Sequence, residues 1–403
     1  MKKSILLTAL AFVALGCSKT EVKPVEDAPA QISWNAVVGK ASTKAPVEGT
    51  AFDKAHKFIT YAFFNAAGTT WPTDASLYID NQVISYYKDA EEPFVADSWH
   101  SGTVNYWPKQ GSLTFFSYSL GDDNHGCSAI VTCTKDDGLK ISGFDVNVSS
   151  DKNRDLMVAD VQTGQKQNTT DQAGAAKGVP TIFRHALTWI TGFQVRTAAD
   201  YYNVGTPSPQ IGSKEITVNS IKICNVYSKG DYQLLYDKNK TNNRDESWNN
   251  QTESHEYAFR VASGASNVAS DVTPVALACD QLLFMPQTFT APNFTYSDGA
   301  TPIQKAIERQ TTAYKEAVKN VGHIELEYTI KTYTSSSDYS EETVKEYIAL
   351  ADFTSSIDGS TNGGDWKINR KITYNITIDL SANIIYWDPI VVEWEEENKT
   401  ISL

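Results

Sequence analysis

The feature that most constrains this fold is a series of short segments in which apolar and polar residues alternate. In residues 31–39 (QISWNAVVG), Ile32, Trp34, Ala36 and Val38 share one face, while serine and asparagine occupy the other. Alternation with a period of two is what a half-buried β-strand requires. Comparable apolar segments follow at 57–64, 77–87, 102–108, 112–119, 139–148, 154–161, 179–197, 215–236, 282–289, 323–334, 341–351, 370–380 and 383–394.

These segments predict an all-β chain with two sandwich domains. A chain of 403 residues is longer than a single core normally supports. Residues 162–178 form the longest stretch without an apolar period, so we place the domains at 31–177 and 178–403. One helix is predicted, over residues 302–319. Because helices do not alternate with the strands, a βαβ fold is disfavoured.

The first seventeen residues (MKKSILLTALAFVALGC) have the pattern of a lipoprotein export signal. The apolar run at 5–15 is shorter than the roughly 20 residues that a membrane-spanning helix needs, so we expect cleavage and lipid attachment at Cys17. Ala14 stands where such signals usually carry leucine. The alternative is an ordinary secretory signal with an incidental cysteine. Residues 18–30 are polar and contain two prolines, which predicts a flexible spacer.

The charge balance narrows the choice of partners. The chain has 35 lysines and arginines against 48 aspartates and glutamates, which gives a net charge of -13. A surface with this excess of negative charge repels nucleic acid and anionic lipid headgroups. We therefore expect no nucleic-acid partner.

Four further cysteines lie beyond the signal, at Cys127, Cys133, Cys224 and Cys279. In an exported protein these residues can form disulfides. On one continuous strand, Cys127 and Cys133 would lie about 20 Å apart, beyond the reach of a disulfide. Buried thiols are the favoured interpretation, and pairing stays open if the chain doubles back between them.

The sequence contains no motif that demands catalysis. Metalloprotease, nucleophile-elbow, phosphate-loop and dinucleotide-binding patterns are absent from it. The loop at 358–366 resembles a calcium loop but has Asn369 where a bidentate glutamate is needed. Trp71, Trp99 and Trp107 fit either sugar binding or core packing, with the core favoured. We predict no catalytic residue, no metal site and no cofactor.

Six segments along the chain form an ordered set: NYWPKQGSLTFFSYS (105–119), RDLMVA (154–159), FRHALTWITGFQV (183–195), LLFMPQ (282–287), WKINRKITYNITIDL (366–380) and IIYWDPIVVEW (384–394). The first contains an aromatic-Trp-Pro hairpin before a Phe-rich strand, four later landmarks follow, and the last forms the C-terminal ending. In this order the segments together resemble the fimbrillin family, the type V pilins of gut and oral Gram-negative bacteria and their lipoprotein relatives.

The resemblance implies two transthyretin-like, Greek-key β-sandwich domains in tandem and assembly into a cell-surface fimbrium. It also implies transport to the outer membrane as a lipoprotein anchored through Cys17. Polymerising relatives lose their first strand to a trypsin-like protease, and the groove then accepts a strand from the next subunit. Here the displaced strand would be 31–39. Cleavage would follow Lys44 or Lys40, although the family often has arginine there.

The donor strand implied by this mechanism is the alternating C-terminal segment. Ile390, Val392 and Trp394 form one apolar face, while Glu393 and Glu395 lie on the other. The alternative is that this strand only completes its own sandwich.

Two other functions remain open from the sequence. The protein could be a pilus tip adhesin or an anchored surface lipoprotein that binds a glycan, a host protein or a bacterial surface ligand without polymerising. An extracellular hydrolase would require carboxylates that cluster in a cleft. Among these alternatives, the non-enzymatic fimbrial subunit is the leading hypothesis, and its partners would be other copies or homologous subunits.

Overall fold

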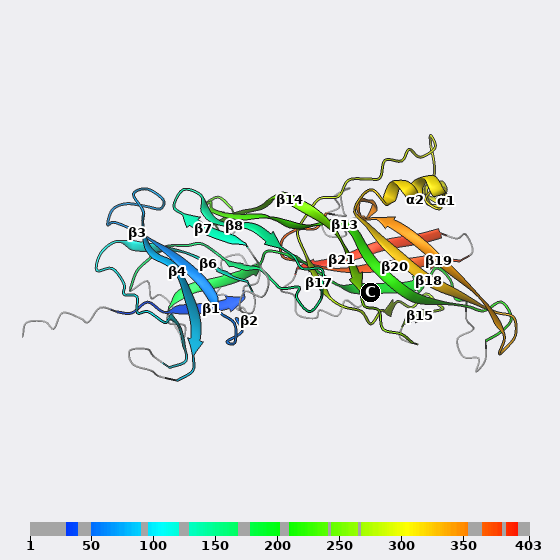
Figure 1. The fold of residues 1–403 in the computed structure, drawn as a ribbon, viewed down its shortest axis with the longest axis horizontal. Helices are drawn as coiled ribbons and strands as arrows, with labels where there is room; N and C mark the ends of the chain where they lie inside the picture. Colours follow the sequence, from blue (N-terminus) through cyan, green and yellow to red (C-terminus); the bar gives the residue numbers. More distant parts are fainter. Residues whose placement is uncertain are drawn as a thin grey trace, which may run out of the picture.

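The computed structural model describes residues 30–38, 50–89, 96–120, 129–167, 178–201, 209–240, 243–264, 267–353, 365–380 and 384–393. The molecule is elongated, with the N-terminal strands at one end and the C-terminal strands at the other (Figure 1). Strands dominate both halves, so the predicted all-β sandwich architecture is confirmed. The transthyretin-like connectivity stays a prediction.

The first sheet contains most of the N-terminal strands in the order β10-β6-β3-β4-β5-β1-β11-β9. Strand β9, at the end of this order, also pairs with β6 near its start. The sheet therefore closes on itself. The side strand β2 pairs with β1. The bounds are β1 (Trp34–Val38), β2 (Thr50–Ala51), β3 (Phe58–Asn65), β4 (Ser76–Tyr87), β5 (Ser98–Ser101), β6 (Ser112–Ser119), β9 (Met157–Ala159), β10 (Gln162–Gln165) and β11 (Val179–His185).

Two further sheets contain the C-terminal strands, and one of them also includes β7 and β8 from the N-terminal part of the sequence. One has the order β16-β12-β20-β21 with β17 beside β12, and the other has the order β19-β18-β13-β8-β7 with β14 and β15 beside β13. The bounds are β7 (Ile130–Thr134), β8 (Gly138–Asp145), β12 (Thr188–Thr197), β13 (Lys214–Tyr236), β14 (Arg244–Phe259), β15 (Val268–Ala269), β16 (Val275–Ala276), β17 (Leu282–Phe284), β18 (His323–Tyr333), β19 (Tyr339–Ala349), β20 (Arg370–Asp379) and β21 (Ile384–Glu393).

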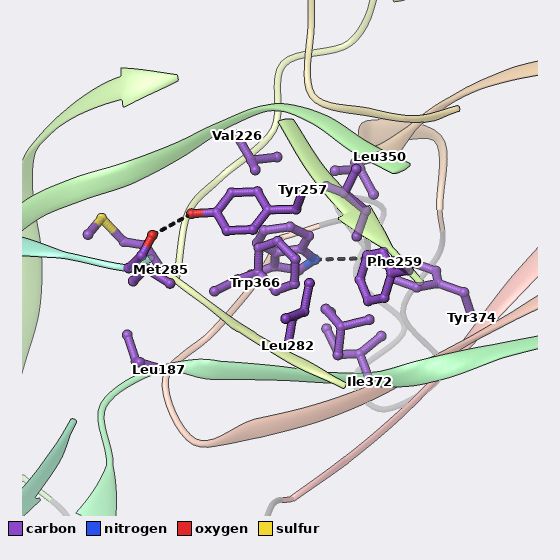
Figure 2. Close-up of a cluster of buried hydrophobic side chains, with 14 of the residues drawn as sticks. Leu187, Val226, Tyr257, Phe259, Leu282, Met285, Leu350, Trp366, Ile372 and Tyr374 are labelled. Atoms are coloured by element: carbon purple, nitrogen blue, oxygen red, sulfur yellow. Dashed lines mark hydrogen bonds between the residues drawn. The ribbon is translucent and has the colours of Figure 1, made fainter. Parts of the chain in front are cut away.

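Aromatic residues fill the core of the C-terminal half. Trp366 lies among Tyr257, Phe259 and Tyr374, as Figure 2 shows. Its indole Nε1–H donates to the Tyr374 hydroxyl at 2.8 Å, and the Tyr257 hydroxyl donates to a backbone oxygen, Val146 O, at 2.9 Å. These hydrogen bonds satisfy polar groups that burial would otherwise leave without a partner.

The two halves share strands and core. Strand β8, which precedes residue 177, pairs with β13, and β11, which follows residue 177, pairs with β1. Strands β3 and β6 are buried on both faces. Ala62 on β3 and Phe115 on β6 belong to the N-terminal core, whereas Phe63 and Phe116 belong to the core that continues into β8 and β13. The division into 31–177 and 178–403 stays a prediction about folding units.

The single helix predicted over residues 302–319 is wrong. The chain forms two short helices, α1 (Pro302–Glu308) and α2 (Thr312–Val318), and a short 3-10 helix η3 (Leu350–Asp352) follows later in the chain. Thr311 interrupts the helical run, since its side chain accepts a hydrogen bond from the Tyr314 amide and so caps the start of α2. Buried Tyr314 and Val318 then anchor α2 on a small separate cluster.

Candidate functional site

The strand β1 inserts its apolar face into the N-terminal core. Trp34 and Ala36 on this strand are 1% and 5% exposed, Ile32 just before it is 3% exposed, and Val38 is half-buried against the same cluster. The Trp34 ring meets Phe115 edge-on, with ring centroids 6.3 Å apart. Residues 33, 35 and 37 are of intermediate exposure, whereas residues 32, 34 and 36 are buried. Removing β1 would therefore open the core of the first sheet.

The pairing of β1 is uneven. It runs parallel to β11 along its whole length, from Trp34 opposite Val179 to Val38 opposite Phe183. On its other side it meets β5 only at Trp99 and the two-residue strand β2. The Val179 amide donates to Ser33 O at 2.8 Å. Without β1, the backbone of β11 would lack its longest partner in this sheet.

The chain that leads into β1 is held by residues 102–108. That segment was predicted as a strand, but it forms only an isolated bridge between Gln31 and Tyr106. The Ile32 amide donates to Asn105 O at 2.8 Å, and the Trp107 amide donates to Ala30 O at 2.9 Å. These bonds fix the start of β1 against the first sheet.

Gly178, just before β11, lets β1 approach closely. Its φ of +132° lies outside the range that L side chains normally adopt. A Cβ atom placed there would lie 2.8 Å from both Ser33 O and the carbonyl carbon of Trp34. Any other residue at this position would press against the strand in the groove.

A buried charge cluster holds β11 to the C-terminal half. Arg184 on β11 donates from Nε and Nη2 to the Asp160 carboxylate at 2.9 and 3.0 Å. Arg244 on β14 donates from Nη1 to Asp160 Oδ1 at 3.2 Å and from Nη2 to Glu246 Oε2 at 2.7 Å. The Tyr232 hydroxyl also donates to Glu246 Oε2, at 2.6 Å.

Electrostatics favour the charged forms of Arg244 and Glu246. Burial would lower the pKa of Arg244, but Tyr232, Glu246 and Asp160 outweigh it and the pKa is raised. Burial likewise acts to raise the pKa of Glu246, and the Arg244 guanidinium outweighs it, so that this pKa is lowered. The cluster therefore joins the two halves through compensated charges.

Sequence reasoning missed Gly178, Arg184, Asp160 and Arg244. Two of these residues could have been found from the sequence, because each is an ionisable residue inside an apolar segment: Asp160 in MVADV and Arg184 in VPTIFRH. Such residues are almost never fully buried unless they are paired.

The C-terminal segment forms an edge strand. Within the described residues, β21 pairs only with β20, antiparallel, from Asp379 opposite Ile384 to Arg370 opposite Glu393. Ile390 lies opposite Thr373 and Val392 opposite Lys371. Trp394 lies outside the described residues, as do the predicted lipid site Cys17 and the predicted processing sites Lys40 and Lys44.

Three of the four cysteines beyond the signal and the candidate Trp99 lie within the described residues. Cys133, Cys224 and Cys279 are free thiols, and burial raises the pKa of Cys224 to about 12, while Cys127 lies outside the described residues. Trp99 is buried in the N-terminal core.

Two kinds of feature are absent from the described residues. No group of three or more His, Cys, Asp or Glu side chains among them could hold a metal ion. In the same part of the chain, no helix combines the length and apolar character needed to cross a membrane.

Comparisons with known proteins agree with this architecture. A fimbrillin-like family model matches residues 43–394, and a search of curated proteins finds no match. A fimbrial protein from Bacteroides vulgatus shares the fold, with a TM-score of 0.56 at 16% identity over 90% of this chain and 99% of that one.

More distant structures are similar over comparable lengths. A candidate cell adhesion protein from Parabacteroides distasonis has a TM-score of 0.44 at 12% identity, covering 92% of this chain and 99% of that one. The C-terminally truncated tip fimbrial protein Mfa3 from Porphyromonas gingivalis has a TM-score of 0.34 at 11% identity, covering 91% and 100%. Because the family model spans most of the sequence, the chain belongs to the fimbrillin-like family and is a structural, non-enzymatic protein.

Proposed function

We propose that this protein is a structural subunit of a cell-surface fimbrium that polymerises by strand donation. In this proposal it is exported as a lipoprotein with its lipid on Cys17, reaches the outer membrane and is cleaved after Lys44 or Lys40. Cleavage frees the segment that contains Ile32, Trp34, Ala36 and Val38. The opened groove then binds the C-terminal strand region, including Ile390, Val392 and Trp394, of another subunit.

The observation that carries the proposal is the double role of β1. The strand covers the N-terminal core and is also the main backbone partner of β11. A fully buried large apolar side chain stabilises a fold by about 2 kcal/mol, and an unpaired sheet edge recruits another strand. A groove without β1 would therefore bind a replacement strand firmly.

The direct test is the N-terminus of the protein in filaments shed from cells. A start at Ala41 or Ala45 supports cleavage and polymerisation. An acylated Cys17 retained on monomeric surface protein would contradict polymerisation and favour the alternative, an anchored lipoprotein or tip adhesin that binds a glycan or host protein.

A further inference from the structure

The sequence of the C-terminal strand repeats that of the first strand. Residues 32–38 read ISWNAVV and residues 385–391 read IYWDPIV. Isoleucine, tryptophan and valine are identical at the first, third and seventh positions, and the serine, asparagine, alanine and valine at the other four are replaced by tyrosine, aspartate, proline and isoleucine. Tryptophan is rare, with 9 in 403 residues, so its matched position is informative.

The identical positions are the ones whose side chains pack into the N-terminal core. Ile32 and Trp34 are almost completely buried and Val38 packs against the same cluster. With a period of two, Ile385, Trp387, Pro389 and Val391 fall at the register positions of Ile32, Trp34, Ala36 and Val38. A strand with the sequence of residues 385–391 would therefore place apolar side chains at the positions that β1 and Ile32 occupy in the groove.

Even the proline fits the backbone of the groove. Since the Val179 amide donates to Ser33 O, residues 33, 35 and 37 are the ones whose backbone groups face β11 in this parallel ladder. The amide at position 36 faces away from β11. Pro389, which has no amide hydrogen, therefore loses no bond to β11 at that position.

The donor must come from a second molecule. In its own chain, Ile384 lies beside Asp379 at the end of β20, and Ile378 lies beside Thr197 at the end of β12. Strand β20 ends at Asp379 and β21 begins at Ile384, and β21 pairs with β20 in the half of the molecule opposite β1 (Figure 1). While β20 stays paired, β21 cannot reach the groove of the same molecule.

We propose that β21 of a second copy of this chain replaces β1, parallel to β11, with Ile385, Trp387 and Val391 in the sites of Ile32, Trp34 and Val38. This inference rests on the proposed function and sets its register. In this register the side chains that enter the groove lie on the opposite face of the donor strand from Ile390, Val392 and Trp394.

The test uses the full mature chain with a specific protease site in place of residues 41–46. After cleavage, labelled peptides compete with the β1 fragment for the groove, and fluorescence anisotropy measures their affinity. Peptide 30–39 is the positive control, and peptide 383–396 is the proposed donor. Trp387→Ala in that peptide is expected to weaken binding at least tenfold, whereas Trp394→Ala, the matched control, changes it less than twofold.

Three results would overturn the inference, and each has a different consequence for the proposed function. If Trp394→Ala weakens binding and Trp387→Ala does not, the register is wrong and strand donation stands. If peptide 30–39 binds but peptide 383–396 does not, the C-terminal segment is not the donor. If peptide 30–39 itself does not exchange, the groove does not open and the proposed function fails as well.

Discussion

At the residue scale, Gly178 controls how closely a strand lies in the groove. We predict that Gly178→Ala destabilises the protein by about 2–3 kcal/mol, because the methyl group meets Ser33 O and the Trp34 carbonyl at 2.8 Å and the positive φ adds strain. Urea unfolding and hydrogen exchange of residues 32–38 measure the effect.

The matched control is Gly264→Ala. Gly264 has a φ of +115° but no heavy atom within 4 Å of an added Cβ, so only the backbone strain of about 1 kcal/mol remains. Equal losses in the two variants, or unchanged exchange in β1, would refute the close-approach role of Gly178.

The buried carboxylate of Asp160 is the centre of the charge cluster. Asp160→Asn removes the charge that faces both Arg184 and Arg244, and we predict a loss of about 3–5 kcal/mol because the guanidinium groups stay buried. The more exposed pair Arg260–Asp280, with side chains 68% and 20% exposed, provides the control, and Asp280→Asn should cost no more than about 1 kcal/mol. Similar losses in both variants would show that the cluster does not join the halves.

The pH dependence of stability tests the same cluster. Glu246 has a lowered pKa in the folded state, so it stabilises the fold above its unfolded value of 4.5, and this stability is lost as the pH falls through the folded-state pKa. We predict that Glu246→Gln flattens the fall in melting temperature below about pH 4.5.

Glu346 is the control for this pH profile. Burial raises its pKa despite the neighbouring Lys315, so its linkage has the opposite sign: its contribution is present at low pH and is lost as the pH rises through the folded-state pKa. Glu346→Gln should therefore leave the acid-side fall in place. The account would be contradicted if Glu346→Gln abolished the fall in melting temperature at low pH and Glu246→Gln left it unchanged.

At the element scale, the donor and acceptor roles belong to different strands and can be separated. A chain without residues 384–403 keeps β1 and β11 but lacks β21. We predict that it is exported and accepts a strand but cannot donate one, so it forms no heat-resistant ladder on a denaturing gel. Mixed with the full chain, it should shorten the ladder, and unchanged ladders would remove the donor role from this segment.

Local pattern predicted the elements better than their ends or partners. Alternation in residues 31–39 was enough to place Ile32, Trp34 and Ala36 in the core, because the period of two fixes which side chains share a face. It did not reveal the Thr311 cap that divides the predicted helix. Nor did it reveal the charge cluster, since Asp160 and Arg244 meet only after distant segments fold together.

At the scale of the whole molecule, the two halves share a sheet and a core and are not separate domains joined by a linker. Strand β13 pairs with β18 along its first part and with β8, from the N-terminal portion of the sequence, along its last part. Such nonlocal pairing is invisible to a scan of local periodicity. A core and a sheet that both halves share would suit a filament subunit that bears tension, as the proposed function requires.

The central claim is that a second copy completes the first sheet, and a reconstruction of shed filaments by electron cryomicroscopy tests it most directly. The account predicts that residues 385–391 of a neighbouring subunit lie parallel to β11, with Trp387 in the site of Trp34. A filament map in which each subunit keeps its own β1 beside β11 would contradict it.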